Sequence, residues 1–186
     1  MDDPSNGSAR AASTRRADAI SDPAGGVDPD ALRHAMSQFA AGVTVATALL
    51  DGVAHALTAT AFSSVSLTPP LCLLCVGKTS RFHAAILGAG TWAVSVLSAD
   101  QEPLARHFAH KGRDLLTQFD GVPHRPAPIS AAPLLLGAIT WLDCRTYAVH
   151  DAGDHTIVVG ELLWVADAEA GAAPLTYHRG TYRRLS

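Results

Sequence analysis

Residues 43–60, VTVATALLDGVAHALTAT, carry the pattern that decides the fold. The positions before Asp51 are rich in β-branched residues and partly alternate in polarity, which favours a strand over a helix. Asp51 and Gly52 form a dipeptide typical of a two-residue hairpin, because both positions of that turn need a positive φ. A return strand then runs from Val53 to about Thr60. The stretch predicts an antiparallel hairpin and a fold built on strands.

The pattern continues on both sides of this hairpin. Leu32, Met36 and Phe39 lie on one side of a predicted helix that begins after Asp28 and ends at Gly42. Four prolines predict a loop at 120–133. Two further helices are expected, at 80–87, where Gly88 ends the helix, and at 100–109. Further strands are expected at 71–76 and 92–97, as a pair of long strands from residue 134 that meet at 151–154, and at 177–185. Six or seven strands with short helices predict a mainly β fold, an antiparallel barrel with helical decoration.

Length and charge limit the classes of protein that remain. The 186 residues fit one domain, with 48% apolar types. Fourteen basic against 17 acidic residues give a net charge of −3, which argues against a nucleic-acid partner. Apolar runs are too short for a membrane span, and the acidic start is unlike a signal peptide, so we expect a cytoplasmic protein. Residues 1–27 predict a disordered tail, or alternatively a helical arm on a partner, and 28–186 form the domain.

Common catalytic and metal motifs fail on context. The G-x-G-x-x-A pattern at 88–93 ends a helix and opens a strand, the reverse of a dinucleotide-binding turn. Cys72 and Cys75 have C-x-x-C spacing but lie within one predicted strand and face opposite sides. Without a second pair they indicate small apolar residues, and no metal site is expected.

Hydroxyl side chains are concentrated after the hairpin. Residues 58–66, TATAFSSVS, hold five hydroxyls, and hydroxyls with nearby backbone N–H groups suit a ligand rich in acceptors, such as a phosphate or a ribityl chain. An edge strand that runs into a Ser/Thr-rich loop is the alternative interpretation, and composition leaves both open.

Four segments in order resemble the flavin reductase-like family: 42–47 (GVTVAT), 58–70 (TATAFSSVSLTPP), 153–155 (GDH) with Gly160, and 174–182 (PLTYHRGTY). The resemblance covers about residues 28–186. It implies an FMN-binding split barrel, which is an antiparallel Greek-key β-barrel, and a homodimer. It also implies that NADH, with NADPH possible, reduces FMN or FAD, and that reduced flavin diffuses to a flavin-dependent monooxygenase.

The resemblance also implies binding residues, by matched motif. Flavin is expected to be lined by Ala56, Leu57, Thr58, Thr60, Ala61, Ser63, Ser64, Cys75, Val76, Gly77, Ser80, Arg81, Phe82, His107 and Phe108. NAD(P)H is expected to contact His155, Tyr177, His178, Arg179 and Gly180. Two positions depart from the family: His107 replaces an arginine, and Ala61 replaces a common serine.

Hydride transfer between cofactors needs positioning rather than a protein acid or base, so no catalytic side chain is expected. A site of neutral hydroxyls and one or two cations predicts flavin as a weakly held co-substrate. Two alternatives stay open: a tightly bound FMN that reduces an imine or a quinone, and a flavin-binding protein without catalysis. The choice between FMN and FAD also stays open, as does NADPH, since Arg179, Arg183 and Arg184 offer cations for a 2′-phosphate.

Overall fold

The computed structural model describes residues 26–167 and 171–185. It divides into two compact units, one ending at Met36 and the other starting at Ser37. The predicted tail, 1–27, lies almost wholly outside the described residues. No helix in the described part of the chain is long and apolar enough to cross a membrane.

Helix α1 (Pro29–Ser37) begins where the sequence predicted, with the Leu32 N–H donating to the Asp28 carbonyl at 3.0 Å. It ends at Ser37, so the expectation of a helix reaching Gly42 was wrong. Phe39 therefore lies beyond the helix. The side chains of Leu32, Met36 and Phe39 are all more than half exposed.

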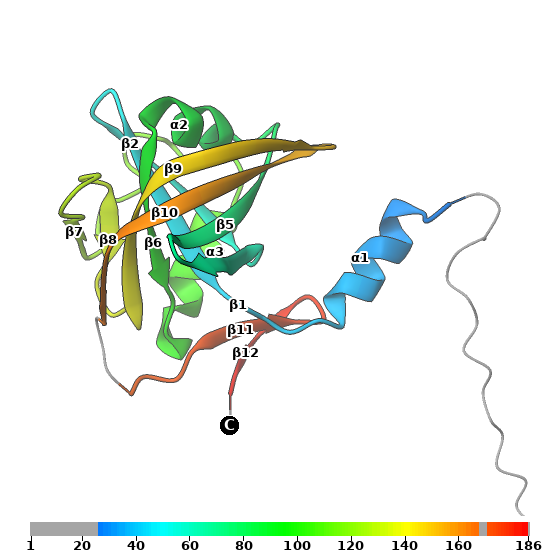
Figure 1. Ribbon diagram of the computed structural model, residues 1–186. Helices are drawn as coiled ribbons and strands as arrows, with labels where there is room; N and C mark the ends of the chain where they lie inside the picture. Colours follow the sequence, from blue (N-terminus) through cyan, green and yellow to red (C-terminus); the bar gives the residue numbers. More distant parts are fainter. Residues whose placement is uncertain (1–25, 168–170, 186) are drawn as a thin grey trace, which may run out of the picture. The chain divides into compact units, whose positions relative to one another are not determined.

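The larger unit is built on one antiparallel sheet of seven strands in the order β3-β2-β6-β9-β10-β5-β4 (Figure 1). Its strands are β2 (Thr44–Leu50), β3 (Val53–Ala59), β4 (Phe62–Leu67), β5 (Pro70–Gly77), β6 (Thr91–Val96), β9 (Thr140–Ala152) and β10 (His155–Asp167). The predicted 43–60 hairpin is confirmed as β2 and β3, which pair from Thr44–Ala59 to Leu50–Val53.

The sheet curls but does not close. β3 and β4 are its two edges, yet only Thr60 and Ala61 separate them along the chain. Three residue steps, from Ala59 to Phe62, span at most about 11 Å. The two edges therefore meet at this end, where the Cys75 N–H also donates to the Ala61 carbonyl at 3.0 Å. This open, curled sheet agrees with the mainly β prediction.

Smaller elements cover the sheet. They are α2 (Arg81–Ala89), a 3₁₀ turn (Ala99–Gln101) leading into α3 (Glu102–Ala109), a three-stranded sheet of β1 (Ala41–Gly42), β11 (Leu175–His178) and β12 (Thr181–Arg184), and a ladder of β7 (His124–Pro126) with β8 (Pro133–Leu135). α3 packs on β3, and the Thr58 hydroxyl donates to the Ala105 carbonyl at 2.7 Å.

Three predicted boundaries were wrong. Gly88 does not end α2, because Gly90 at φ 68° forms the C-cap. Gly88 instead packs closely on another strand, since a Cβ added to it would lie 3.1 Å from Leu50 Cδ1. The strand predicted at 177–185 is a hairpin, β11 and β12, turning at Arg179 and Gly180 with φ 50° and 76°. The predicted 120–133 loop contains β7, and the strand expected from residue 134 is β8 followed separately by β9.

Trp92 and Gly160 lie in close contact in the core. Trp92 on β6 is fully buried in a cluster with Leu74, Phe82 and Val158. A Cβ added to Gly160 on β10 would lie 2.4 Å from Trp92 Cζ2, which no real Cβ tolerates. Only glycine fits against this indole ring.

Gly160→Ala should lower the free energy of unfolding by about 1–3 kcal/mol, because the indole ring must move within a packed core. Chemical denaturation measures the change. Gly42→Ala is the matched control: a Cβ there meets nothing within 4 Å, so its stability should stay within about 1 kcal/mol of the wild type. Equal effects of the two substitutions would contradict this explanation of Gly160.

Candidate functional site

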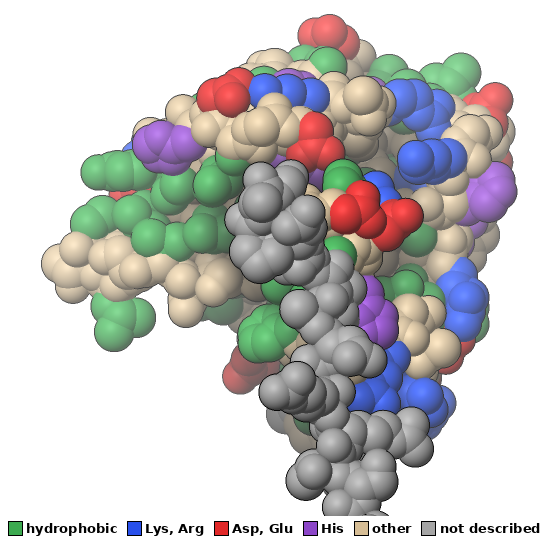
Figure 2. All heavy atoms as spheres, turned by 90° about the vertical axis from the view of Figure 1, so that its right-hand side faces the viewer, with side chains coloured by type: hydrophobic (Ala, Val, Ile, Leu, Met, Phe, Trp, Pro, Cys, Tyr) green, Lys and Arg blue, Asp and Glu red, His purple; other side chains and the backbone are tan. Residues whose placement is uncertain are grey.

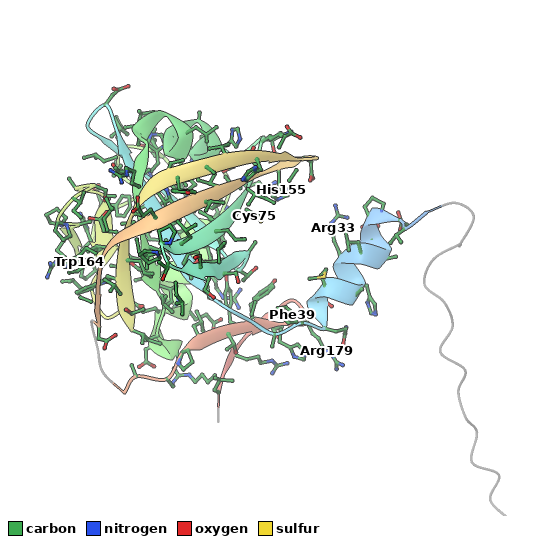
Figure 3. The ribbon with its side chains drawn as sticks, in the orientation of Figure 1. Arg33, Phe39, Cys75, His155, Trp164 and Arg179 are labelled. Atoms are coloured by element: carbon green, nitrogen blue, oxygen red, sulfur yellow. The ribbon has the colours of Figure 1, made fainter. Side chains whose placement is uncertain are left out.

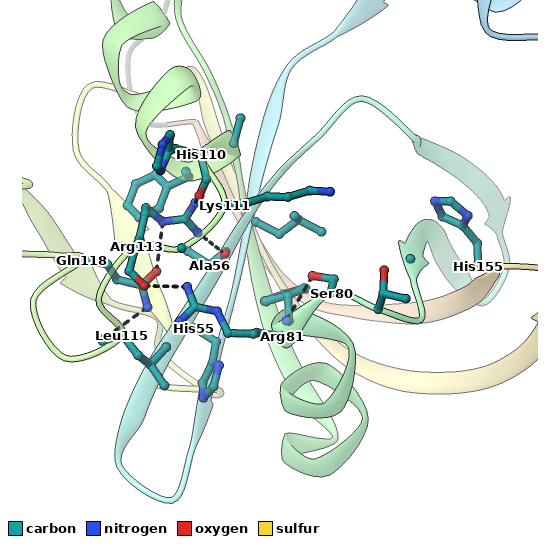
Figure 4. Close-up of a pocket in the computed structure, with 17 residues that line it drawn as sticks. His55, Ala56, Ser80, Arg81, His110, Lys111, Arg113, Leu115, Gln118 and His155 are labelled. Carbon is teal, nitrogen blue, oxygen red and sulfur yellow. Dashed lines mark hydrogen bonds between the residues drawn. The ribbon is translucent and has the colours of Figure 1, made fainter. Parts of the chain in front are cut away.

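A cavity of about 580 Å³ lies where β3, the start of α2 and the segment after α3 come together (Figure 4). A volume of this size is typical of a small-molecule site. Its lining residues are His55, Ala56, Leu57, Gly77, Thr79, Ser80, Arg81, Phe82, Phe108, Ala109, His110, Lys111, Gly112, Arg113, Leu115, Gln118 and His155.

The N-terminus of α2 forms one wall of the cavity. Ser80 is the N-cap with extended backbone angles, and its Oγ accepts from the Phe82 N–H at 3.2 Å. The Ser80 N–H donates to the Gly77 carbonyl at 2.9 Å, which fixes the turn between β5 and the helix. Arg81 is the first residue of α2. The helix dipole and this guanidinium together favour an anion at the wall.

Arg113 holds the opposite wall in place. Its guanidinium donates to the Ala56 carbonyl at 2.9 Å and to the carbonyls of His107 and His110, and it lies 5.5 Å from the centre of the Phe108 ring. The Arg81 side chain donates in turn to the Arg113 carbonyl at 2.7 Å. Burial and the Arg81 charge lower the pKa of Arg113, but a guanidinium remains protonated at neutral pH.

Gln118 fastens the same segment at a second point. Its Nε2 donates to the Ala54 carbonyl at 2.8 Å. This carbonyl lies two residues before the Ala56 carbonyl, which accepts from Arg113. Both acceptors lie on β3, an edge strand whose outer carbonyls would otherwise lack sheet partners. The two side chains therefore replace a neighbouring strand and fix the position of the wall.

Lys111 supplies a further cation to the cavity lining. Its ammonium forms no hydrogen bond or ion pair with any residue in the described part of the chain. Figure 4 shows its side chain extending from the segment after α3 toward the middle of the lining residues. An anionic ligand can therefore pair with Lys111 without breaking an existing contact.

Three histidines line the cavity, and two of them, His155 and His55, lie in different surroundings. His155 lies across the cavity from Arg113 (Figure 4), and its Nδ1–H donates to Asp154 Oδ1 at 2.8 Å. That bond lowers the pKa of Asp154, keeping its carboxylate charged, and leaves the His155 Nε2 for other partners. Burial, with Arg81 nearby, lowers the pKa of His55, so the His55 imidazole is neutral at neutral pH.

The structure brings together eight of the residues predicted from the resemblance: Ala56, Leu57, Gly77, Ser80, Arg81, Phe82, Phe108 and His155. Eight expected flavin contacts do not line the cavity in this structure: Thr58, Thr60, Ala61, Ser63, Ser64, Cys75, Val76 and His107. Thr58 is committed to α3 through its hydroxyl, and Val76 is fully buried in the core. Cys75 lies on β5, beside the strand that carries His155 (Figure 3).

His107 also lies outside the cavity lining. Its Nε2–H donates to the Gln118 carbonyl at 2.8 Å, and its ring packs edge-on against Phe108 at 4.8 Å. The imidazole holds the segment after α3 instead of facing the cavity. Arg113 and Lys111 do line the cavity, and the sequence analysis, which noted that His107 replaces the family's arginine, named neither of them. The run 110–113 (HKGR) directly after a helix was the available signal.

A second hollow of about 300 Å³ adjoins the first, since Ala109 and His110 line both. Its other lining residues are Arg106, Tyr177, Gly180 and Tyr182. Of the expected NAD(P)H contacts, Tyr177 and Gly180 therefore lie here, and His178 does not. Arg179, at the β11–β12 turn (Figure 3), donates through Nε to Gln38 Oε1 at 2.7 Å.

Comparison with known proteins assigns the fold. The flavin reductase like domain matches residues 36–186. This chain belongs to that family. An NADH-dependent FAD reductase from Streptomyces globisporus is 40% identical over 171 residues, 90% of this chain and 93% of that protein. The reductase component of 4-hydroxyphenylacetate 3-monooxygenase from Thermus thermophilus is 37% identical over 156 residues, 84% of this chain and 96% of that protein.

A solved structure supports the same assignment. The flavin reductase component of a bacterial two-component tryptophan halogenase, BorF, superposes with a TM-score of 0.80 and 42% identity, covering 85% of this chain and 98% of that chain. The split-barrel fold expected from the resemblance is confirmed.

The donor set of the cavity fits a flavin of this family. A flavin nucleotide combines a flat apolar ring system with a phosphate. Phe82, Phe108 and Leu57 supply apolar surface, while Arg81, Lys111 and the α2 N-terminus supply positive charge. Charges of both signs are otherwise interspersed over the face shown in Figure 2.

Lys111→Met should raise the KM for FMN by roughly two- to fivefold and leave that for riboflavin unchanged, because only FMN carries the phosphate that an exposed ammonium can pair with. Steady-state NADH oxidation at varied flavin concentration measures both constants. Arg33→Met, which removes a cation of α1 outside the cavity, is the control. An equal change for riboflavin would show that Lys111 does not act through charge.

Proposed function

We propose that this chain is an NADH-dependent flavin reductase that supplies reduced flavin to a separate monooxygenase. The observation that carries the proposal is the 580 Å³ cavity, which joins apolar surface, unpaired positive charge and His155. The names of the relatives support it: an NADH-dependent FAD reductase and the reductase components of a monooxygenase and a halogenase. The split-barrel family assignment agrees with it.

The residues of the cavity divide the work of binding. Bound flavin accepts a hydride from NADH and leaves as reduced flavin. Arg81, Lys111 and the α2 N–H groups hold the phosphate, and Phe82 and Phe108 give the ring system an apolar surface. His155 contacts the nicotinamide nucleotide, with Asp154 fixing the orientation of its imidazole. Bringing the two reactants together is the main contribution, since hydride transfer requires no proton from the protein.

The same geometry favours flavin as a co-substrate. The side chains of Arg81 and Lys111 are exposed, and an exposed charge pair contributes little binding energy. A flavin held mainly by such contacts exchanges readily, as delivery to a second protein requires.

We further propose that the protein is a homodimer, because Val65 and Leu67 of β4 expose apolar surface that a second copy can cover. We also propose that it acts in the cytoplasm.

NADH oxidation should depend on added flavin. Purified protein is mixed with NADH, and absorbance at the nicotinamide band is followed with FMN, FAD, riboflavin or no flavin. Oxidation only with added flavin supports the proposal and ranks the flavins. Yellow protein that oxidises NADH unaided would favour a bound cofactor and another acceptor, and flavin binding without oxidation would favour a non-catalytic binder.

His155→Ala should raise the KM for NADH roughly tenfold, the value of one lost hydrogen bond, with the KM for flavin unchanged. The measurement is initial rate at varied NADH and saturating flavin. His150→Ala, which changes an exposed histidine on β9 outside the cavity lining, is the matched control. A shift in the flavin constant instead would move His155 from the nicotinamide side to the flavin side.

A further inference from the structure

We propose that His55 is a further binding residue of the cavity, which takes up a proton when a phosphorylated flavin binds and pairs with the flavin phosphate as a cation. This inference rests on the proposed function and deepens it, because it names a side chain that distinguishes FMN from riboflavin. His55 lines the cavity from β3 and is not among the flavin contacts that the family resemblance implies.

The cavity lining carries positive charge without a balancing carboxylate. No aspartate or glutamate is among the described residues that line it, whereas its ionisable side chains are Arg81, Lys111, Arg113, His55, His110 and His155. Asp114 and Asp154 adjoin the lining in sequence, but Asp114 accepts from backbone N–H groups of its own turn and Asp154 accepts from His155. The lining therefore favours an anionic ligand and opposes additional positive charge while the cavity is empty.

The His55 imidazole is half-buried and lies among these cations. It forms no hydrogen bond or ion pair with any residue in the described part of the chain. Arg81, from the start of α2, lines the same cavity and is fixed by its bond to the Arg113 carbonyl (Figure 4). β2 places Ala48 opposite His55, and α3 contributes only uncharged residues to the lining, so neither element adds a charge. The charged groups of the lining around His55 are therefore all positive.

Without a ligand the His55 imidazole is neutral at neutral pH. Burial and the Arg81 charge lower its pKa from the usual value of histidine. Arg113 experiences the same Arg81 charge, but a guanidinium has no neutral form near pH 7. Of these three groups, His55 is therefore the one that gives up its charge in the empty cavity, and it can regain that charge when an anion binds.

A bound phosphate reverses this balance. Arg81, Lys111 and the N-terminus of α2 hold the phosphate in the proposed function, which adds negative charge beside His55. An opposite charge within about 4–6 Å favours the protonated imidazole, whose N–H then donates a charge-assisted hydrogen bond to a phosphate oxygen. The pKa of His55 therefore rises on binding. Its contribution to affinity is fully present below the pKa of the empty state and is lost as the pH rises through the pKa of the bound state.

The first test measures the proton directly. The flavin-free full chain is titrated with FMN by calorimetry at about pH 6.5, near the ordinary pKa of histidine, in two phosphate-free buffers of different ionisation enthalpy. The dependence of the heat on that enthalpy gives the number of protons taken up. Wild-type protein should take up more protons than His55→Gln, and His150→Gln, which changes an exposed histidine outside the cavity lining, should match the wild type. Equal uptake by wild type and His55→Gln, a loss of uptake in His110→Gln instead, or no binding of FMN overturns the proposal.

The second test separates the charge of His55 from its shape. The Kd for FMN should be roughly threefold higher in His55→Gln than in the wild type at about pH 6, and the difference should shrink toward about pH 8, where the imidazole loses its proton. His55→Lys carries a permanent cation, so it should bind FMN tightly at both pH values with no more proton uptake than His55→Gln. Riboflavin, which lacks the phosphate, should bind all three proteins equally. A His55-dependent pH effect on riboflavin, or a difference for FMN that ignores pH, overturns the proposal.

The two proposals fail separately. His55-dependent proton uptake on FMN binding, in a protein that oxidises no NADH with any flavin, would sustain the role of His55 and reject the reductase. Normal NADH oxidation with FMN, combined with equal proton uptake by wild type and His55→Gln, would sustain the reductase and reject the role of His55.

Discussion

The contact between Trp92 and Gly160 is the constraint on which the rest of the structure depends. The indole of Trp92 occupies the space where position 160 would carry a side chain. The pairing of β10 with β9 shifts register at Val159 and Gly160, and such a bulge bends a strand and increases its twist. Cys72 and Cys144 approach to 3.9 Å between their sulfurs in the same layer. A sheet bent here can curl until its edge strands meet.

The curl determines where the functional groups lie. β10 begins at His155, which pairs with Gly77 at the end of β5. The chain leaves β5 there and enters α2, so the helix N-terminus and His155 are brought to one end of the sheet. α3 packs on β3 from the other side. The cavity is the space between these elements, and no single segment of the sequence contains it.

Two like charges, one from each wall of the cavity, lie close together. Arg81 and Arg113 repel each other, which contributes to the lowered pKa of Arg113. Both remain in place because each guanidinium donates to backbone carbonyls, Arg81 to position 113 and Arg113 to Ala56 and its neighbours. Hydrogen bonds to carbonyl dipoles offset the repulsion without neutralising the charge. The site therefore remains positively charged toward an anionic ligand. Lys111 adds a cation whose ammonium has no partner among the described residues.

The sequence by itself determined most strands of the main sheet, the hairpin at Asp51 and Gly52, the cap at Ser80 and the family. These depend on local turn chemistry and on residue order, which a linear pattern contains. It misplaced the end of α2, because Gly88 is required by Leu50 on another strand, and it read β11 and β12 as one strand, because Arg179 takes a positive φ against its preference. It missed Lys111 and Arg113, and it placed His107 in the flavin lining, whereas the His107 imidazole is bonded to the Gln118 carbonyl. Only the tertiary structure decided which of these side chains face the cavity. The reason is that the direction of a cationic side chain depends on which carbonyls distant strands present to it.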